Sequence, residues 1–195
     1  IDEAPIGITI TDPSQADNPI IYVNDRFREL TGYSEAGVLG RNCRFLQGEA
    51  TEPEPVARMR EAVANEDSVS VELRNYRKDG TEFWSQVSIA PVRDEHGSVV
   101  NYVGFQRDIS DQRRRERALR EMYDIISDRH QSFGDKVQAL LELGRTELNT
   151  EYGTLSDIRG EEYVFEFVAT DDDSIQSGDV VPVSVTNCEL VASSE

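Results

Sequence analysis

Cysteine and histidine are scarce in this chain of 195 residues, which contains only Cys43, Cys188, His96 and His130. The two cysteines lie 145 positions apart and form neither a disulfide framework nor a zinc site, which needs several Cys or His ligands at short spacings. No serine or cysteine motif beside either histidine indicates a hydrolytic triad, and the chain has no GxGxxG or P-loop pattern. We therefore expect no metal site, a reducing compartment and no enzymatic activity.

Long apolar runs are also absent. No stretch approaches the roughly 20 apolar residues that a membrane helix needs. The first residues lack the charged, apolar and small-residue regions of a signal peptide. We expect a cytoplasmic protein without a membrane contact, with room for one or two domains that are stable without disulfides or metals.

Lysine is limited to Lys78 and Lys136, and all other basic residues are arginines. Because the chain has 38 acidic and only 20 basic residues, the formal net charge is −18 and the sequence pI is about 4.4. Such a surface repels nucleic acids and anionic membranes. It favours a halophilic source, where salt screens the repulsion between carboxylates, so dilute buffer is expected to unfold the chain in part. An ordinary acidic protein from a mesophile is the alternative.

Charge and pattern divide the chain into three regions. Residues 1–110 carry a net charge of −8, residues 111–149 are neutral, and residues 150–195 carry 11 acids against Arg159 alone. Short runs bounded by turn residues predict five strands in the first region: residues 6–11, 20–23, 69–77, 82–90 and 99–108. Short helices are expected after the caps Asn24 and Ser34 and over residues 55–65. The prediction is an α+β fold, a five-stranded antiparallel sheet with helices on one face.

The second region is helical in pattern. Its apolar residues recur at spacings of three and four: Leu119, Met122, Ile126, Phe133, Leu140 and Leu143. Arg129 and Lys136 interrupt this seam, which is short and imperfect for a coiled coil. Ser132 followed by Asp135 predicts a second helix start. We expect helices over about 111–128 and 133–148, which either pack on their own domains or form a dimer.

Cys43 lies in the stretch GRNCRFLQG, over residues 40–48. If 42–47 form a helical turn, the Cys43 thiol and the Gln47 amide point to the same side. On this spacing alone, a packing role for the cysteine is the alternative, because lone buried cysteines usually pack.

Arg60 lies on the apolar stripe of its predicted helix, between Val56 and Val63. Its guanidinium must therefore reach water or meet an anion. Arg44, on the motif turn, could bind a phosphate together with Arg60. Ion pairs with nearby glutamates are the alternative.

Polar side chains are expected on the sheet face that the helices cover. Ser85 shares a face with Val87, and Gln106 lies on the last strand. Asn75 joins the face of Ser85 only if the loop at 78–80 has an odd number of residues, as in a three-residue loop with Gly80 left-handed. Amides and a hydroxyl beside an apolar surface suit a planar heteroaromatic ring with polar edges.

These motifs closely resemble the LOV (light-oxygen-voltage) subclass of PAS domains: GRNCRFLQG, Arg60 in RMREAV, Asn75 in LRNYRKDG, FWSQV at 83–87 and Gln106 in GFQRDIS. The resemblance covers about residues 5–110 and implies a blue-light photoreceptor that binds flavin. It implies FMN rather than FAD, because the segment from Gly48 to Arg60 lacks the insertion common in members that take FAD.

The resemblance implies that Cys43 is the photoactive thiol, which adds reversibly to flavin carbon C4a. Gln106 would answer the protonation of flavin N5 and relay the signal to the linker. The implied flavin-binding residues are Asn42, Arg44, Gln47, Arg60, Asn75, Ser85 and Gln106. Ser85 departs from the family's usual asparagine, which is expected either to weaken flavin retention or to shift the spectrum slightly. A light-independent flavin redox sensor and a PAS interaction module without flavin are the alternatives.

Residues 133–195 resemble the beginning of a GAF domain, like that of haloarchaeal bacterio-opsin activator regulators. The implied organisation is a LOV domain over 1–110, a signalling helix linker over 111–132 and the N-terminal part of a GAF domain over 133–195. We expect a homodimer through the linker helices and the GAF segment, with a DNA-binding domain elsewhere in the full protein. Arg113–Arg115 is expected to be a solvated helix face rather than a nucleic-acid contact, and Cys188 a packing residue.

Overall fold

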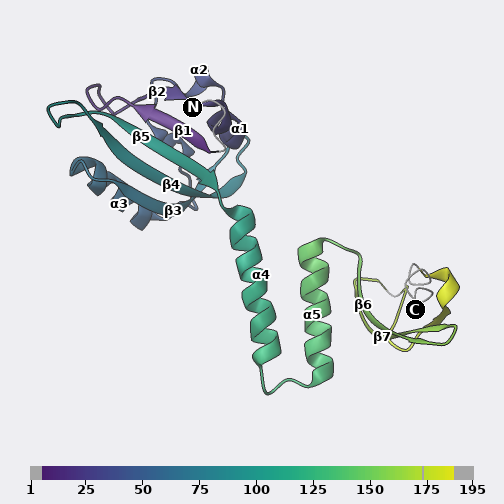
Figure 1. The fold of residues 1–195 in the computed structure, drawn as a ribbon. Coiled ribbons are helices and arrows are strands. Elements are labelled where there is room, and N and C mark those ends of the chain that lie inside the picture. Colours follow the sequence, from purple (N-terminus) through teal and green to yellow (C-terminus); the bar gives the residue numbers. More distant parts are fainter. Residues whose placement is uncertain (1–5, 173, 187–195) are drawn as a thin grey trace. The chain divides into compact units, whose positions relative to one another are not determined.

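The computed structural model describes residues 6–172 and 174–186, coloured by sequence in Figure 1. The chain forms two compact units, Ile1–Arg113 and Arg114–Glu195. The elements of the first unit are β1 (Gly7–Thr11), β2 (Ile20–Val23), α1 (Asp25–Thr31), α2 (Glu35–Val38), the 3-10 helix η1 (Cys43–Leu46), α3 (Pro53–Ala64), β3 (Val69–Tyr76), β4 (Glu82–Arg93) and β5 (Val99–Asp108).

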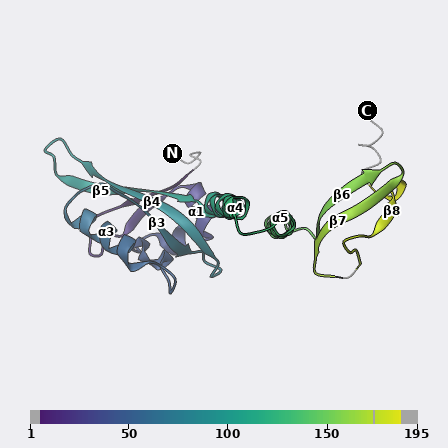
Figure 2. The same ribbon diagram turned by 90° about the horizontal axis from the view of Figure 1, so that it is seen from below.

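The sheet of the first unit is antiparallel, with the strand order β2-β1-β5-β4-β3. The helices inserted between β2 and β3 cover one of its faces, as α3 does beneath β3 and β4 in Figure 2. The predicted α+β fold with five antiparallel strands is therefore confirmed. Strand alternation points the following buried residues to the covered face: Thr9, Thr11, Val71, Leu73, Asn75, Phe83, Ser85, Val87, Tyr102 and Gln106.

The loop between β3 and β4 decides which side chains share that face. The Arg77 N–H donates to the Thr81 carbonyl at 2.9 Å, which leaves a three-residue loop whose Gly80 has φ +86°. In the resulting register Asn75 lies opposite Phe83, and Leu73 lies opposite Ser85. Since directly opposed residues project to the same side, the condition set by the sequence is met: the loop has an odd number of residues, and Asn75 and Ser85 share a face.

Asn24 joins the sheet to the first helix. Its side chain is fully buried, and its Oδ1 accepts from the Phe27 N–H at 3.0 Å as the predicted helix cap. The same oxygen accepts from the Ile8 N–H at 2.7 Å, while Nδ2 donates to the Ile6 carbonyl at 2.9 Å. One amide thus satisfies backbone groups of both β1 and α1.

Two boundaries in the first unit differ from the prediction by two or more residues. Helix α3 begins at Pro53 rather than residue 55, because proline fits the first helical positions, where its missing N–H costs nothing. Strand β4 continues to Arg93 rather than residue 90, and its last pair with β5 is shifted by an irregularity. Alternation weakens at the end of β4, where every residue is at least partly exposed.

The second unit begins within α4 (Ser110–Ser127), close to the predicted 111–128. Its other elements are α5 (Phe133–Leu148), β6 (Tyr152–Arg159), β7 (Glu162–Thr170), β8 (Val180–Pro182) and the 3-10 helix η2 (Val183–Val185). The strands form an antiparallel sheet in the order β6-β7-β8, in which the three-residue β8 was not predicted. Cys188 lies outside the described residues. Within the described residues, no helix combines the length and the apolar character needed to cross a membrane.

Helix α5 packs on β6 and β7. Its start is a capping box, in which the Ser132 hydroxyl accepts from the Asp135 N–H and the Asp135 carboxylate accepts from the Ser132 N–H. At the packed face, Gln138 Nε2 donates to the Val168 carbonyl at 2.8 Å. A Cβ on Gly153 would lie 2.8 Å from the Leu141 carbonyl oxygen, so the close approach of β6 to α5 requires glycine. The predicted helix over 133–148 is confirmed.

Candidate functional site

A cavity of about 460 Å³ lies between the covered face of the sheet and the segments η1 and α3. This volume is typical of sites for small molecules and cofactors. Its apolar lining residues include Leu46, Val56, Met59, Val63, Leu73, Val87 and Ile89. Its polar lining residues include Thr9, Thr11, Gln15, Asp17, Asn18, Asn42, Cys43, Arg44, Gln47, Arg60, Asn75, Tyr102 and Gln106.

The motif over residues 40–48 forms one wall of this cavity. Gly40 has φ +77°, a left-handed conformation that ends the preceding segment. Asn42 Oδ1 accepts from the Arg44 N–H at 3.1 Å and caps a 3-10 turn rather than a full α-helical turn. Cys43 and Gln47 nevertheless both line the cavity, as their spacing predicted.

The last residue of the motif is Gly48, where an aromatic ring leaves no room for a side chain. A Cβ at this position would meet the Tyr76 ring at 2.4 Å. The Tyr76 hydroxyl accepts from the Ala50 N–H at 2.8 Å, and the Thr51 hydroxyl donates to the Arg74 carbonyl at 2.6 Å. The segment between the motif and α3 is thereby held against the edge strand β3.

The Cys43 side chain is half-buried at the cavity wall. Desolvation by burial raises the pKa of the thiol to about 11, while the neighbouring Thr9 hydroxyl acts in the opposite direction. The thiol is therefore protonated at neutral pH. Thr9 is opposed across the strands by Gly104, where a Cβ would lie 2.5 Å from the Thr9 hydroxyl oxygen.

Several buried polar atoms around the cavity have no hydrogen-bond partner. They are Thr11 Oγ1, Asn18 Oδ1, Asn75 Oδ1 and Gln106 Oε1, all from lining residues. A buried acceptor without a partner costs about 1–3 kcal/mol. The cavity therefore suits a ligand that brings hydrogen-bond donors to the sheet, and amides beside Val87 and Leu73 fit the polar edge of a planar ring such as a flavin.

Two arginines line the same cavity. Arg44 Nη1 lies 2.7 Å from both carboxylate oxygens of Asp17, so the ion pair expected as the alternative exists, with an aspartate rather than a glutamate. Arg60 makes no ion pair or hydrogen bond within the part of the chain that the structure describes. One guanidinium is thus neutralised by the protein, and the other is available to an anion.

Seven of the eight predicted flavin-site residues are brought together. Asn42, Cys43, Arg44, Gln47, Arg60, Asn75 and Gln106 all line the cavity. Ser85 lies on the same sheet face, but it is fully buried, does not line the cavity, and its Oγ has no partner. The prediction missed several lining residues, among them Thr9, Gln15, Asp17 and Asn18. The available signal for the last two was the turn sequence Asp17-Asn18-Pro19 before the second strand.

No group of three or more His, Cys, Asp or Glu side chains suited to a metal ion occurs within residues 6–172 and 174–186.

Comparison with known proteins gives consistent matches to the first unit. A family model described as PAS domain matches residues 5–111. The light state structure of the blue-light photoreceptor Aureochrome1 LOV is similar with a TM-score of 0.54 and 48% sequence identity. That similarity covers 55% of this chain and 84% of the compared chain.

Two curated relatives extend the comparison to full-length proteins. The bacterioopsin transcriptional activator of Halobacterium salinarum is 48% identical over 132 residues, which cover 66% of this chain and 20% of that protein. A blue-light-activated histidine kinase of Brucella anthropi is 32% identical over 186 residues, covering 95% of this chain and 38% of that protein. The chain thus spans well under half the length of either relative.

Proposed function

The chain belongs to the PAS domain family and its first unit is a LOV domain, a blue-light sensor; from this premise we propose that its cavity binds FMN and that Cys43 is the light-reactive residue. The observation that carries the proposal is the convergence of a protonated thiol with unpartnered buried amide oxygens in one cavity. A packing cysteine would not explain those orphaned acceptors.

Bound FMN would supply the absorption of blue light and a ring carbon that accepts sulfur. Cys43 would supply the sulfur for that carbon and, from its broken S–H bond, the proton for the neighbouring ring nitrogen. This exchange would consume no external oxidant or reductant, and its reversal in the dark would restore the thiol. Gln106, whose amide oxygen lacks a partner, is placed to respond to the protonated nitrogen, because an amide can present either its acceptor or its donor.

The preference for FMN over FAD rests on the segment between the motif and α3. This segment is short and is held against β3 by hydrogen bonds of Thr51, Glu52 and Tyr76. The Glu52 carboxylate accepts two of them from Arg74, each 2.9 Å long. In this proposal the phosphate end of FMN would lie beside Arg44 and Arg60, which both line the cavity. Asn42 and Gln47 would contact the ribityl chain and the ring, and Asn75 the polar ring edge.

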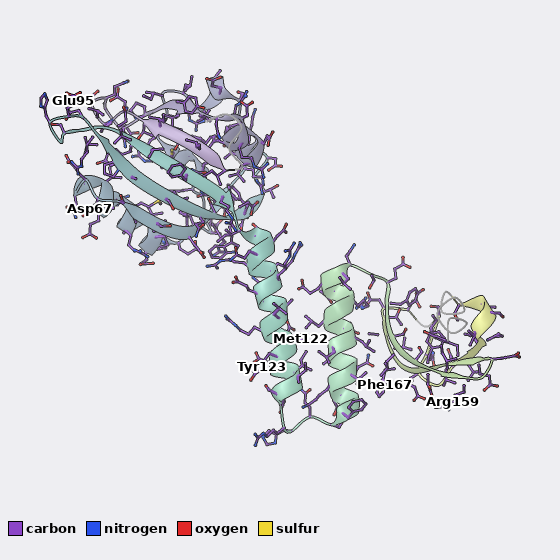
Figure 3. All side chains as sticks on the ribbon, in the orientation of Figure 1. Asp67, Glu95, Met122, Tyr123, Arg159 and Phe167 are labelled. Atoms are coloured by element: carbon purple, nitrogen blue, oxygen red, sulfur yellow. The ribbon has the colours of Figure 1, made fainter. Side chains whose placement is uncertain are left out.

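We infer that the signal leaves the first unit along β5 into α4. Beyond the junction α4 carries an exposed apolar stripe at helical spacing: Leu119, Met122, Tyr123 and Ile126. Met122 and Tyr123 can be followed on α4 in Figure 3. Such a stripe suits a homodimer through the linker helices, with residues 111–132 as the signalling linker.

Residues 133–195 of the second unit are proposed to be the N-terminal part of a GAF domain within a longer cytoplasmic regulator from a halophilic archaeon. The similarity to the Halobacterium salinarum activator and the acidic surface support this. In this proposal the chain is a sensory module without catalytic activity of its own, and nucleic-acid binding belongs to another part of the full protein.

The test is an absorption spectrum of the purified chain in high salt, before and after blue light. The parent is compared with Cys43→Ala and with Cys188→Ala as the matched control. We expect a yellow protein that bleaches reversibly in the parent and in Cys188→Ala but not in Cys43→Ala. A yellow protein that never bleaches would indicate a redox flavoprotein, and a colourless protein that refuses added FMN would indicate an interaction module.

A further inference from the structure

We propose that Asp17 sets how strongly the cavity prefers a phosphorylated flavin, because its carboxylate holds the guanidinium of Arg44. This inference rests on the proposed flavin site and concerns a residue of the loop between β1 and β2. Asp17 therefore acts as a specificity-determining residue for the phosphate end of the ligand.

Two contacts tie Asp17 to the turn that carries Cys43. Its carboxylate oxygens both lie 2.7 Å from Arg44 Nη1, and its backbone carbonyl accepts from Asn42 Nδ2 at 2.6 Å. All three residues line the same cavity. The acidic side chain therefore faces the place where a phosphate would meet Arg44.

The ion pair between Asp17 and Arg44 is readily exchanged. Their side chains are 54% and 61% exposed, and such solvated pairs contribute little to stability. A phosphate group offers Arg44 a stronger partner through charge-assisted hydrogen bonds. It must, however, displace or share the Asp17 carboxylate, and this competition for Arg44 outweighs direct repulsion, because the exposed carboxylate is screened by solvent.

Arg60 gives the phosphate a second contact without such a competitor, since it has no ion pair within the described residues. Riboflavin has the same ring and ribityl chain as FMN but no phosphate. The charge of Asp17 should therefore weaken FMN selectively and leave riboflavin nearly unaffected. The ratio of the two affinities isolates this effect from general damage to the cavity.

The charge of Asp17 can be removed without changing the backbone conformation. Its φ of +72° lies in the left-handed region, which asparagine and aspartate tolerate better than other non-glycine residues. Asp17→Asn keeps this conformation and the carbonyl that accepts from Asn42. The control variant is Asp157→Asn, which removes a similarly solvated ion pair outside the cavity. Asp157 and Arg159 are 52% and 58% exposed, and their charged groups lie 2.8 Å apart.

The experiment measures FMN and riboflavin affinity of the whole chain at the lowest salt concentration at which it is fully folded. Asp17→Asn is expected to tighten FMN binding about threefold to tenfold and to change riboflavin binding by less than about twofold. Asp157→Asn should change neither. The gain for FMN should shrink in molar salt, where charges are screened.

A second arm tests the route through Arg44. In an Arg44→Gln background, Asp17→Asn should give a much smaller gain for FMN; a full gain there overturns the role of Arg44. Equal changes for FMN and riboflavin, or an unchanged ratio, overturn the role of Asp17 while leaving the flavin site intact. If the parent binds neither flavin, the proposed function itself fails, and this inference fails with it.

Discussion

The guanidinium of Arg113, in the first turn of α4, lies 3.6 Å from the centre of the Trp84 ring on β4. The same guanidinium donates to a Glu72 carboxylate oxygen from Nη2 at 2.7 Å. The backbone of Trp84 also holds this junction, because its N–H donates to the Ser110 hydroxyl and its carbonyl accepts from the Ile109 N–H, each at 2.9 Å. Trp84 is the only tryptophan in the chain, so its emission reports on the start of the linker helix.

Arg113→Ala should loosen the first turn of α4. The lost cation–π contact and the half-exposed ion pair with Glu72 together account for about 1 kcal/mol of local stability. We expect a red shift of Trp84 emission and faster amide exchange at residues 110–114. Arg117→Ala, at an exposed position further along the helix, should change neither. Unaltered Trp84 emission in Arg113→Ala would contradict the structural role of this contact.

Gln106 connects the cavity to β5. It is buried opposite Val87, and its amide oxygen has no protein partner. Gln106→Leu removes one hydrogen bond to the ligand, which should weaken FMN binding about fivefold. Bleaching through Cys43 should survive, whereas the light-induced change in amide exchange of α4 should be lost. A light response of α4 that persists at full size in this variant would exclude Gln106 as the relay.

Ser85 carries a buried hydroxyl without a partner. Ser85→Ala should leave the flavin-free chain equally stable or stabilise it by up to about 1 kcal/mol, since an unsatisfied group is removed. Because Ser85 does not line the cavity, FMN release should be unchanged. Thermal unfolding without flavin and the FMN release rate measure the two effects. Faster FMN release would instead show that the hydroxyl reaches the ligand.

Much of the first unit was predictable because strand alternation and turn chemistry are local. The three-residue loop with Gly80 fixes the register between β3 and β4. This register alone decides that Asn75 points to the cavity face. The position of Ser85 was predictable to the same extent. That it stops short of the cavity was not, because the depth of a side chain below a surface depends on how its neighbours pack.

The contacts of Asp17 could not be predicted from local pattern. Its partner Arg44 is 27 positions away, and its left-handed backbone belongs to a loop whose shape depends on the bond from Asn42. In the second unit, β8 has only three residues and depends on pairing with β7. A strand that short carries too little alternation to be recognised before its partner is known.

The raised pKa of Cys43 predicts how the proposed photoreaction depends on pH. Burial raises the pKa from the ordinary value of 9.0 to about 11, so the thiol keeps its proton well above neutral pH. The amplitude of bleaching should stay constant from neutral pH to about pH 9 and fall only as the pH approaches about 11. A loss of amplitude centred at pH 9 or below would show that ionisation of Cys43 is not suppressed by burial.

The same shift has a consequence for stability. The unfolded chain ionises Cys43 near pH 9, whereas the folded chain does so only near 11, so stability is retained below pH 9 and declines as the pH rises through this window. Cys43→Ala lacks the titrating group and should show a shallower loss of stability between these pH values. Urea unfolding of the parent and the variant at neutral pH and at pH 10 measures the difference. Equal slopes for both proteins would mean that the thiol titrates alike in the folded and unfolded states, and that burial does not raise the pKa of Cys43.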